Sequence, residues 1–124
     1  MAILRSFTDP APEPNIDYPH PERLIRGNPK RTTWNRYEEN GVFMGEWACE
    51  VGAWKIAFGN DEHEYFQVIS GRCRVCDEQG NGTEYGPGDG CMMGPRFVGT
   101  FEVLQPLLKR YMIIDRSCES IFPM

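Results

Sequence analysis

Glu64 is the residue whose position in the sequence first suggests chemistry. It stands seven residues before Gly71, and the largely hydrophobic run YFQVI follows it directly. A strand of this kind can carry the carboxylate ligand of a metal site into a β-barrel, and histidines usually complete such a site. The chain has only two histidines, His20 and His63. The first question is therefore whether Glu64 binds a metal ion or has another partner.

Neither histidine is expected to share a metal ion with Glu64. Neighbouring residues of a strand point to opposite faces of the sheet. If Glu64 faces the interior, His63 faces outward, and His20 belongs to a separate N-terminal segment. The same alternation places Cys73 and Cys76 on opposite faces, so we expect neither a zinc site nor a redox pair there.

Alternating short segments from residue 32 onward predict an all-β domain. Between Val42 and Val51, apolar side chains recur at every second position, as in a strand with one buried face. Glycine-rich turns at residues 59–61, 78–82 and 86–90 punctuate the pattern. No segment beyond the N-terminal arm has a helical period, so we expect a sandwich or a barrel. The expected strands cover residues 42–51, 54–58, 63–69, 72–77, 91–93, 100–103 and 107–114.

The proline-rich N-terminus predicts an extended arm over residues 1–31, followed by a single domain over residues 32–124. Repeated prolines exclude a long helix in this arm. Residues 21–27 are expected to form one short turn or an edge strand. We expect the arm to lie on the surface of its own domain or of a partner subunit, and disorder of residues 1–15 is the alternative.

Composition narrows the class of protein. The formal net charge of −5, from 13 basic and 18 acidic residues, argues against a nucleic-acid partner. The sequence has no run of about 20 apolar residues and no secretory leader pattern, so we expect no membrane partner and a cytoplasmic location. The five cysteines have no framework-like spacing, which favours free thiols.

Two glycine-anchored segments carry a family resemblance. GAWKIAFGNDEHEYFQVISG (52–71) and GPGDGCMMGPRFVGTFE (86–102) together resemble the two signature motifs of the cupin superfamily. Within it, the chain resembles the small single-domain cupins related to ureidoglycine aminohydrolase and to the ethanolamine-utilisation cupin. The shared features are GEW (45–47), DEHE (61–64), GPGD (86–89) and KRY (109–111). The resemblance covers residues 32–114 and implies a cupin (RmlC-like) jelly-roll barrel.

The departures from the family pattern concern the metal site. The family's first motif has an H-x-H pair before its glutamate, and counting back from Glu64 puts that pair on Phe58 and Asn60, or on Ala57 and Gly59. The histidine of the second motif falls on Gly99. Only the glutamate remains, so we expect neither a metal ion nor a cofactor.

The resemblance also implies that Lys109 and Tyr111 of the last strand point into the same interior as Glu64. A carboxylate among apolar groups needs a cation or hydrogen-bond donors. A pocket with these groups suits a small polar or anionic metabolite. The alternatives are a structural ion pair between Glu64 and Lys109, or a Lys109 that reaches solvent. The residues expected to bind the ligand are Trp54, Phe58, Glu64, Phe66, Lys109 and Tyr111.

Three functions remain open on the sequence alone. The first is a small-molecule-binding cupin without the usual histidine ligands. The second is a small aminohydrolase-like or isomerase-like enzyme that uses Glu64 and Lys109, or a metal ion held by carboxylates. The third is a structural cupin whose barrel is filled by its own side chains. A homodimer is expected in each case, because such barrels leave sheet edges and apolar outer faces. The N-terminal arm would serve as a strap across its interface.

Overall fold

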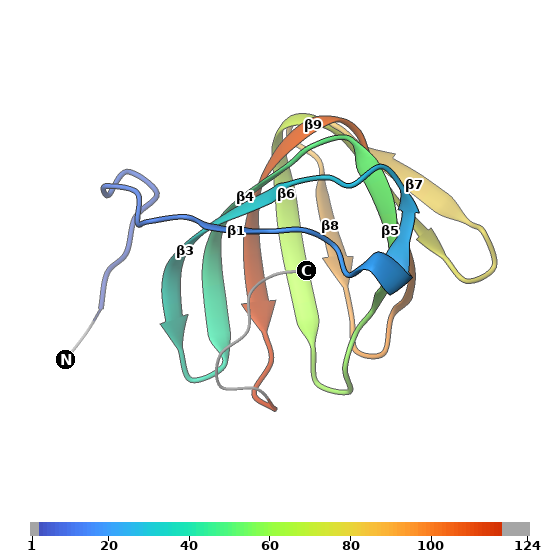
Figure 1. The fold of residues 1–124 in the computed structure, drawn as a ribbon. Helices are drawn as coiled ribbons and strands as arrows, with labels where there is room; N and C mark the ends of the chain where they lie inside the picture. Colours follow the sequence, from blue (N-terminus) through green and yellow to red (C-terminus); the bar gives the residue numbers. More distant parts are fainter. Residues whose placement is uncertain (1–2, 118–124) are drawn as a thin grey trace.

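The computed structural model describes residues 3–117, and these residues form one curled antiparallel sheet (Figure 1). The only helical segment in this range is a single 3-10 turn, η1 (Pro21–Arg23), as the absence of a helical period predicted. The nine strands are β1 (Asn15–Asp17), β2 (Leu24–Arg26), β3 (Arg31–Glu39), β4 (Val42–Cys49), β5 (Gly52–Ala57), β6 (His63–Asp77), β7 (Gly82–Tyr85), β8 (Gly90–Met93) and β9 (Val98–Ile114).

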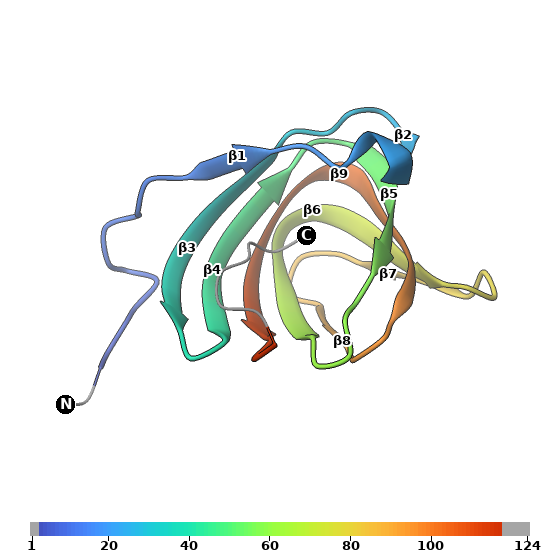
Figure 2. The same cartoon turned by 60° about the horizontal axis from the view of Figure 1, so that its bottom comes forward.

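Two long strands, β6 and β9, close the sheet into a barrel. Residues 107–114 of β9 pair with β4, and residues 98–103 of the same strand pair with β5. Strand β6 pairs with β9 over almost its whole length, and its other edge pairs with β8 and β7. Seen along the barrel, these strands form a continuous curved wall (Figure 2). The jelly-roll class predicted from the sequence is confirmed.

The strand boundaries differ from the sequence prediction at two places. The predicted strands 63–69 and 72–77 form the single strand β6, and the predicted strands 100–103 and 107–114 form the single strand β9. Gly71 and Pro106 look like strand ends in the sequence. In the structure they lie together where the register between β6 and β9 shifts, and Gly71 has a φ of 87°. Irregularities of this type bend a strand without ending it.

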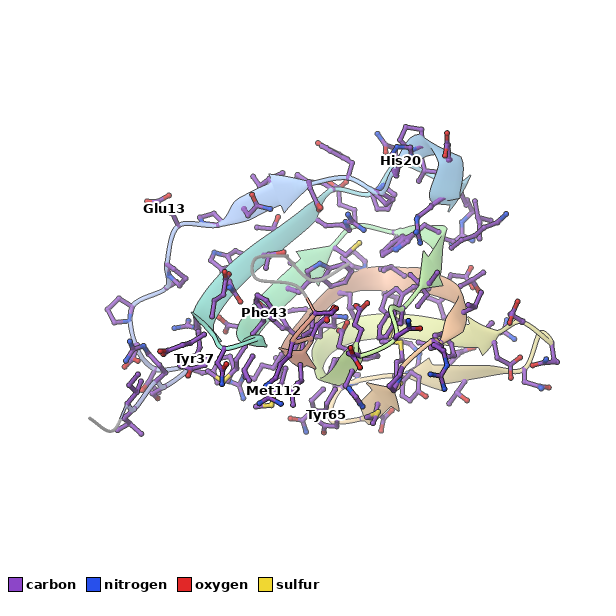
Figure 3. The ribbon with its side chains drawn as sticks, turned by 90° about the horizontal axis from the view of Figure 1, so that it is seen from below. Glu13, His20, Tyr37, Phe43, Tyr65 and Met112 are labelled. Atoms are coloured by element: carbon purple, nitrogen blue, oxygen red, sulfur yellow. The ribbon has the colours of Figure 1, made fainter. Side chains whose placement is uncertain are left out.

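Side-chain alternation places one face of each strand in the core. In β4, every second residue from Phe43 to Cys49 is buried, as its period of two predicted. Along β6, Glu64, Phe66 and Val68 are buried, and their neighbours face outward. Tyr65 of β6 and Met112 of β9 are Cα partners and lie exposed on the outer surface of the sheet (Figure 3).

The N-terminal arm lies on its own barrel. Strand β1 pairs with β3, and β2 pairs with β5, so the arm runs from one side of the barrel to the other (Figure 1). Both alternatives for residues 21–27 occur together, because η1 leads directly into the edge strand β2. No helix in the described part of the chain is long and apolar enough to cross a membrane.

Candidate functional site

The centre of the barrel holds an ion pair between Glu64 and Lys109. The Lys109 ammonium donates a hydrogen bond to Glu64 Oε2 over 2.7 Å. The side chain of Glu64 is 2% exposed and that of Lys109 is 1% exposed. Glu64 comes from β6 and Lys109 from β9, which are neighbouring strands. The ion pair was one of the alternatives expected from the sequence, and the structure excludes a Lys109 side chain that reaches solvent.

Three aromatic rings surround the Lys109 ammonium. Its Nζ lies 4.5 Å from the ring centre of Trp47, 4.4 Å from that of Phe66 and 4.9 Å from that of Phe101. Distances of this size allow the negative faces of the rings to stabilise the cation. We call Glu64 together with these three rings the ammonium cage. The cage replaces the water that the ammonium loses on burial.

The other predicted site residues lie in the same core but outside the cage. Trp54 packs against the rings of Trp47 and Phe101, and it carries the Arg31 guanidinium over its outer face at 5.4 Å. The Tyr111 hydroxyl donates to Asn35 Oδ1 over 2.6 Å. The pKa of Tyr111 is raised, mainly by burial and to a smaller extent by the negative charge of Glu64.

Phe58 belongs to the same buried core, but its ring contact is with a residue outside the cage. Its ring packs against Phe97 with the centroids 6.2 Å apart, and its backbone N–H donates to the Phe97 carbonyl. Of the six predicted site residues, Glu64, Phe66 and Lys109 are the ones that form the cage and its cation.

Trp47 and Phe101 belong to the cage, but the sequence prediction did not include them. Trp47 is the Cα partner of Lys109 across β4 and β9, and Phe101 lies in the other half of β9. Alternation marks both residues as interior-facing. Strand register, which a single sequence does not reveal, is what brings them next to Lys109.

Two buried hydrogen-bond donors in the core have no acceptor. Among the described residues, Trp47 Nε1 and Trp54 Nε1 are the buried side-chain nitrogen and oxygen atoms without a partner. The two indoles are neighbours, with ring centroids 6.1 Å apart. An unsatisfied buried donor destabilises a protein by about 1–3 kcal/mol, so each one requires an explanation.

Burial also controls the acidity of other groups around the core. Desolvation raises the pKa of Cys73 to about 11 and that of Cys49 to about 12, although the positive charges of Lys109 and Arg31 partly oppose it. Cys49, Cys73, Cys76 and Cys91 are free thiols, as expected, and Cys118 lies outside the described residues. Burial likewise raises the pKa of Glu62.

The residues at the family's metal-binding positions do not fit a metal ion. Phe58 offers no ligand atom, and Asn60 is exposed in a turn. At Gly99 even a Cβ atom would collide with the Cys76 carbonyl oxygen, so a histidine has no room there. Within residues 3–117 no three His, Cys, Asp or Glu side chains are grouped to hold an ion. His63 lies on the outer part of β6, with Nδ1 3.3 Å from the Asp61 carbonyl.

A surface hollow lies where the arm meets the barrel. It has a volume of about 220 Å³ and is lined by the arm together with Arg31, Trp54 and Lys55. Trp54 is the one predicted site residue that lines it. The hollow contacts neither Glu64 nor Lys109.

Solved structures share this fold at low sequence identity. A protein of unknown function of the DUF861 family from Pseudomonas syringae pv. tomato matches 90% of this chain with 19% identity and a TM-score of 0.71, and the match spans 44% of that protein. The Clostridium difficile EutQ protein matches 77% of this chain and 78% of its own, with 15% identity and a TM-score of 0.65. A cupin superfamily protein from Desulfitobacterium hafniense matches 68% of this chain and 76% of its own, with 7% identity and a TM-score of 0.58.

Sequence comparison identifies the family directly. No curated protein matches the chain. The family model described as the EutQ-like cupin domain matches residues 38–111, which form more than half of the chain and include both Glu64 and Lys109. This agrees with the ethanolamine-utilisation part of the resemblance, and the relation to ureidoglycine aminohydrolase stays a prediction. The chain therefore belongs to the family of EutQ-like cupin domains.

Proposed function

We propose that this protein is a metal-independent cupin that binds a small polar or anionic metabolite inside its barrel. In this proposal the Lys109 ammonium supplies the positive charge that a metal ion supplies in other cupins. Glu64 keeps its place on the strand but serves as the counter-ion of Lys109 over 2.7 Å. Its metal-binding role is lost together with the histidines.

The observation that carries the proposal is the pair of unsatisfied indole N–H groups. Trp47 Nε1 and Trp54 Nε1 are buried without an acceptor, and the Lys109 ammonium lies over the Trp47 ring. The two donors favour a guest that brings acceptor atoms, while the charge of Lys109 is already balanced by Glu64. A polar or anionic guest with acceptor oxygens meets this requirement, and a cation without acceptors does not.

A filled, purely structural barrel is the second candidate, and burial is the observation that favours it. Each predicted ligand-binding residue is at most 7% exposed, and Phe66 and Lys109 are fully buried. A guest must therefore displace side chains on entering. The two candidates differ in whether the barrel retains a small molecule.

Elemental analysis tests the metal-independent part of the proposal. Protein purified without added metal should contain far less than one Mn, Fe, Ni or Zn ion per chain. The Glu64→Ala variant should give the same result, because Glu64 is already paired with Lys109. Near one ion per chain in the wild type, lost in this variant, would contradict the proposal.

Native mass spectrometry tests the binding part. The wild-type protein should carry a small co-purifying anion that is released on activation. In Glu64→Gln the shape is kept but the negative charge beside Lys109 is removed, so the fold should persist and ligand retention should change. A wild-type protein that carries no adduct, and whose melting temperature no small carboxylate or phosphate raises, would support the filled barrel instead.

A further inference from the structure

The hollow between the arm and the barrel gathers positive charge on a protein of formal net charge −5. Arg23 comes from η1, Arg31 from the start of β3 and Lys55 from β5. The hollow also includes Tyr18 and His20 of the arm. The second nitrogen of His20 is a donor, since Nδ1 accepts a hydrogen bond from the Glu22 backbone N–H.

The three cations differ in how far they are already neutralised. Arg31 is bound by both oxygens of Asp17, with N–O distances of 2.8 and 2.7 Å, so its charge is compensated. Arg23 and Lys55 form no ion pair with any residue that the structure describes. Two cations without an ion-pair partner therefore border this hollow, and both also border a neighbouring hollow that includes Asp77 and Glu78.

We propose that this hollow is a binding site for a small organic dianion, such as a dicarboxylate or a phosphate monoester. Two positive charges that form no ion pair match two negative charges on the ligand. Trp54 and Pro19 in the lining provide apolar contact, which favours an organic ligand over an inorganic ion. A volume of about 220 Å³ lies below the range of about 300–1,000 Å³ that is typical for drug-sized ligands, so the ligand is a small metabolite.

The proposal gives the N-terminal arm a function in binding. Tyr18, His20 and Arg23 reach the hollow because β1 and β2 attach the arm to opposite sides of the barrel. Strand β2 pairs at Leu24 with Trp54, which fixes η1 beside the hollow. Without the arm, Arg31, Trp54 and Lys55 would border an open surface.

The site is separate from the interior site of the proposed function. It shares only Trp54 with the predicted interior residues, and it contains neither Glu64 nor Lys109. A barrel that proved to be filled with side chains would leave this proposal unchanged. The test below therefore uses residues outside the core and does not touch the ammonium cage.

The test is an NMR titration of ¹⁵N-labelled protein with succinate and, in parallel, with phenyl phosphate. We expect saturable shifts of the amides of Tyr18, His20 and Lys55 with at least one probe. Arg23→Gln and Lys55→Gln should each weaken binding about tenfold, as expected for the loss of one charge-assisted hydrogen bond. Arg96→Gln removes an exposed positive charge outside the hollow and is the matched control.

Two results would overturn the proposal. One is the absence of saturable shifts at these amides at millimolar concentrations of either probe. The other is equal weakening by Arg23→Gln, Lys55→Gln and Arg96→Gln, which would show attraction to overall charge only. Selective binding of succinate or of phenyl phosphate would identify the anion as a dicarboxylate or as a phosphate monoester. Succinamide, the neutral analogue of succinate, should not bind.

Discussion

At the residue scale, Lys109 is a charged residue that is completely buried in the barrel, so its desolvation is costly. A fully buried ammonium needs compensation from every side. It receives a carboxylate at 2.7 Å and three aromatic faces within 4.9 Å. Removing one partner of a buried ion pair typically destabilises a protein by about 3–5 kcal/mol. The pair is therefore a strong constraint on the fold, whether or not the barrel holds a ligand.

Glu62 provides a pH-dependent prediction at the same scale. Burial raises its pKa above the ordinary value of 4.5, and the negative charges of Asp115 and Glu64 add to this, while a hydrogen bond from the Gly59 N–H opposes it. Because the folded-state pKa is raised, the contribution of Glu62 to stability is complete below about pH 4.5 and is lost as the pH rises through the folded-state value.

Glu62→Gln should consequently be more stable than the wild type at pH 7 and nearly equal to it at pH 4. The amide oxygen can still accept the hydrogen bond from the Gly59 N–H. Urea unfolding at both pH values measures the difference, with Asp61→Asn in the same turn as an exposed control. A Gln variant that is no more stable than the wild type at pH 7 would contradict the assigned direction of the shift.

Thiol reactivity is a second prediction from the raised pKa values. Cys49 and Cys73 have pKa values of about 12 and about 11 and are buried, so almost no thiolate is present near pH 8. Iodoacetamide should leave both unmodified in the folded protein and alkylate both in urea. Mass spectrometry of tryptic peptides reads the result. Rapid alkylation of Cys73 in the native protein would contradict its placement in the core.

At the element scale, β6 and β9 decide the architecture because each pairs with three other strands of the sheet. Gly71 makes the bend of β6 possible. A Cβ atom there would collide with the Pro106 carbonyl oxygen, and its φ of 87° is unfavourable for other residues. Gly80, in the turn between β6 and β7, has a φ of 84° but no atom within 4 Å of a Cβ position.

The two glycines therefore give a matched comparison. Gly80→Ala should destabilise the protein by about 1–2 kcal/mol, the usual cost of the left-handed conformation. Gly71→Ala has the same backbone cost and an additional collision with β9. Its loss of unfolding free energy should therefore be clearly larger than that of Gly80→Ala. Chemical denaturation of both variants tests this. Equal losses would mean that β6 and β9 do not approach each other at Gly71.

The alternation of apolar residues predicts which side chains are interior, but it does not predict which of them contact one another. Glu64, Phe66 and Lys109 were placed inside from alternation and family resemblance, and all three are buried. Trp47 and Phe101 escaped notice because they contact Lys109 through the pairing of distant strands. The strand ends predicted at residues 70–71 and 104–106 do not occur, because β6 and β9 continue through these residues. Glycine and proline end a short strand in most sequences, but they only bend one that has partners on both sides.

At the scale of the whole molecule, one apolar row crosses the outer face of the sheet. Tyr65 is the Cα partner of both Met92 and Met112, and Met112 is the partner of Met44. Tyr65, Met92 and Met112 are 48%, 62% and 43% exposed. Figure 3 shows Tyr65 and Met112 on the side of the molecule away from His20. A row of this kind is where we expect the homodimer to form.

Met112→Glu should therefore convert a micromolar dimer into a monomer without unfolding it, because a carboxylate in the centre of the row would be buried unpaired in the dimer. Ile25→Glu is the control, since Ile25 is similarly exposed, at 51%, but lies on β2 of the arm. Sedimentation velocity separates the outcomes. A wild-type monomer at micromolar concentration would exclude the dimer, and a dimer that survives Met112→Glu would place its interface elsewhere.

The most direct test of the barrel centre is a double-mutant cycle on unfolding free energy with Glu64→Gln and Lys109→Met. If the buried contact of 2.7 Å holds the barrel together in place of a metal ion, the single variants should lose several kcal/mol. The double variant should lose little more than one of them, because Lys109→Met fills the same space without a charge. The expected coupling is about 2–3 kcal/mol. A coupling below about 0.5 kcal/mol would show that the two groups act independently, and the contact between them would then not hold the barrel together.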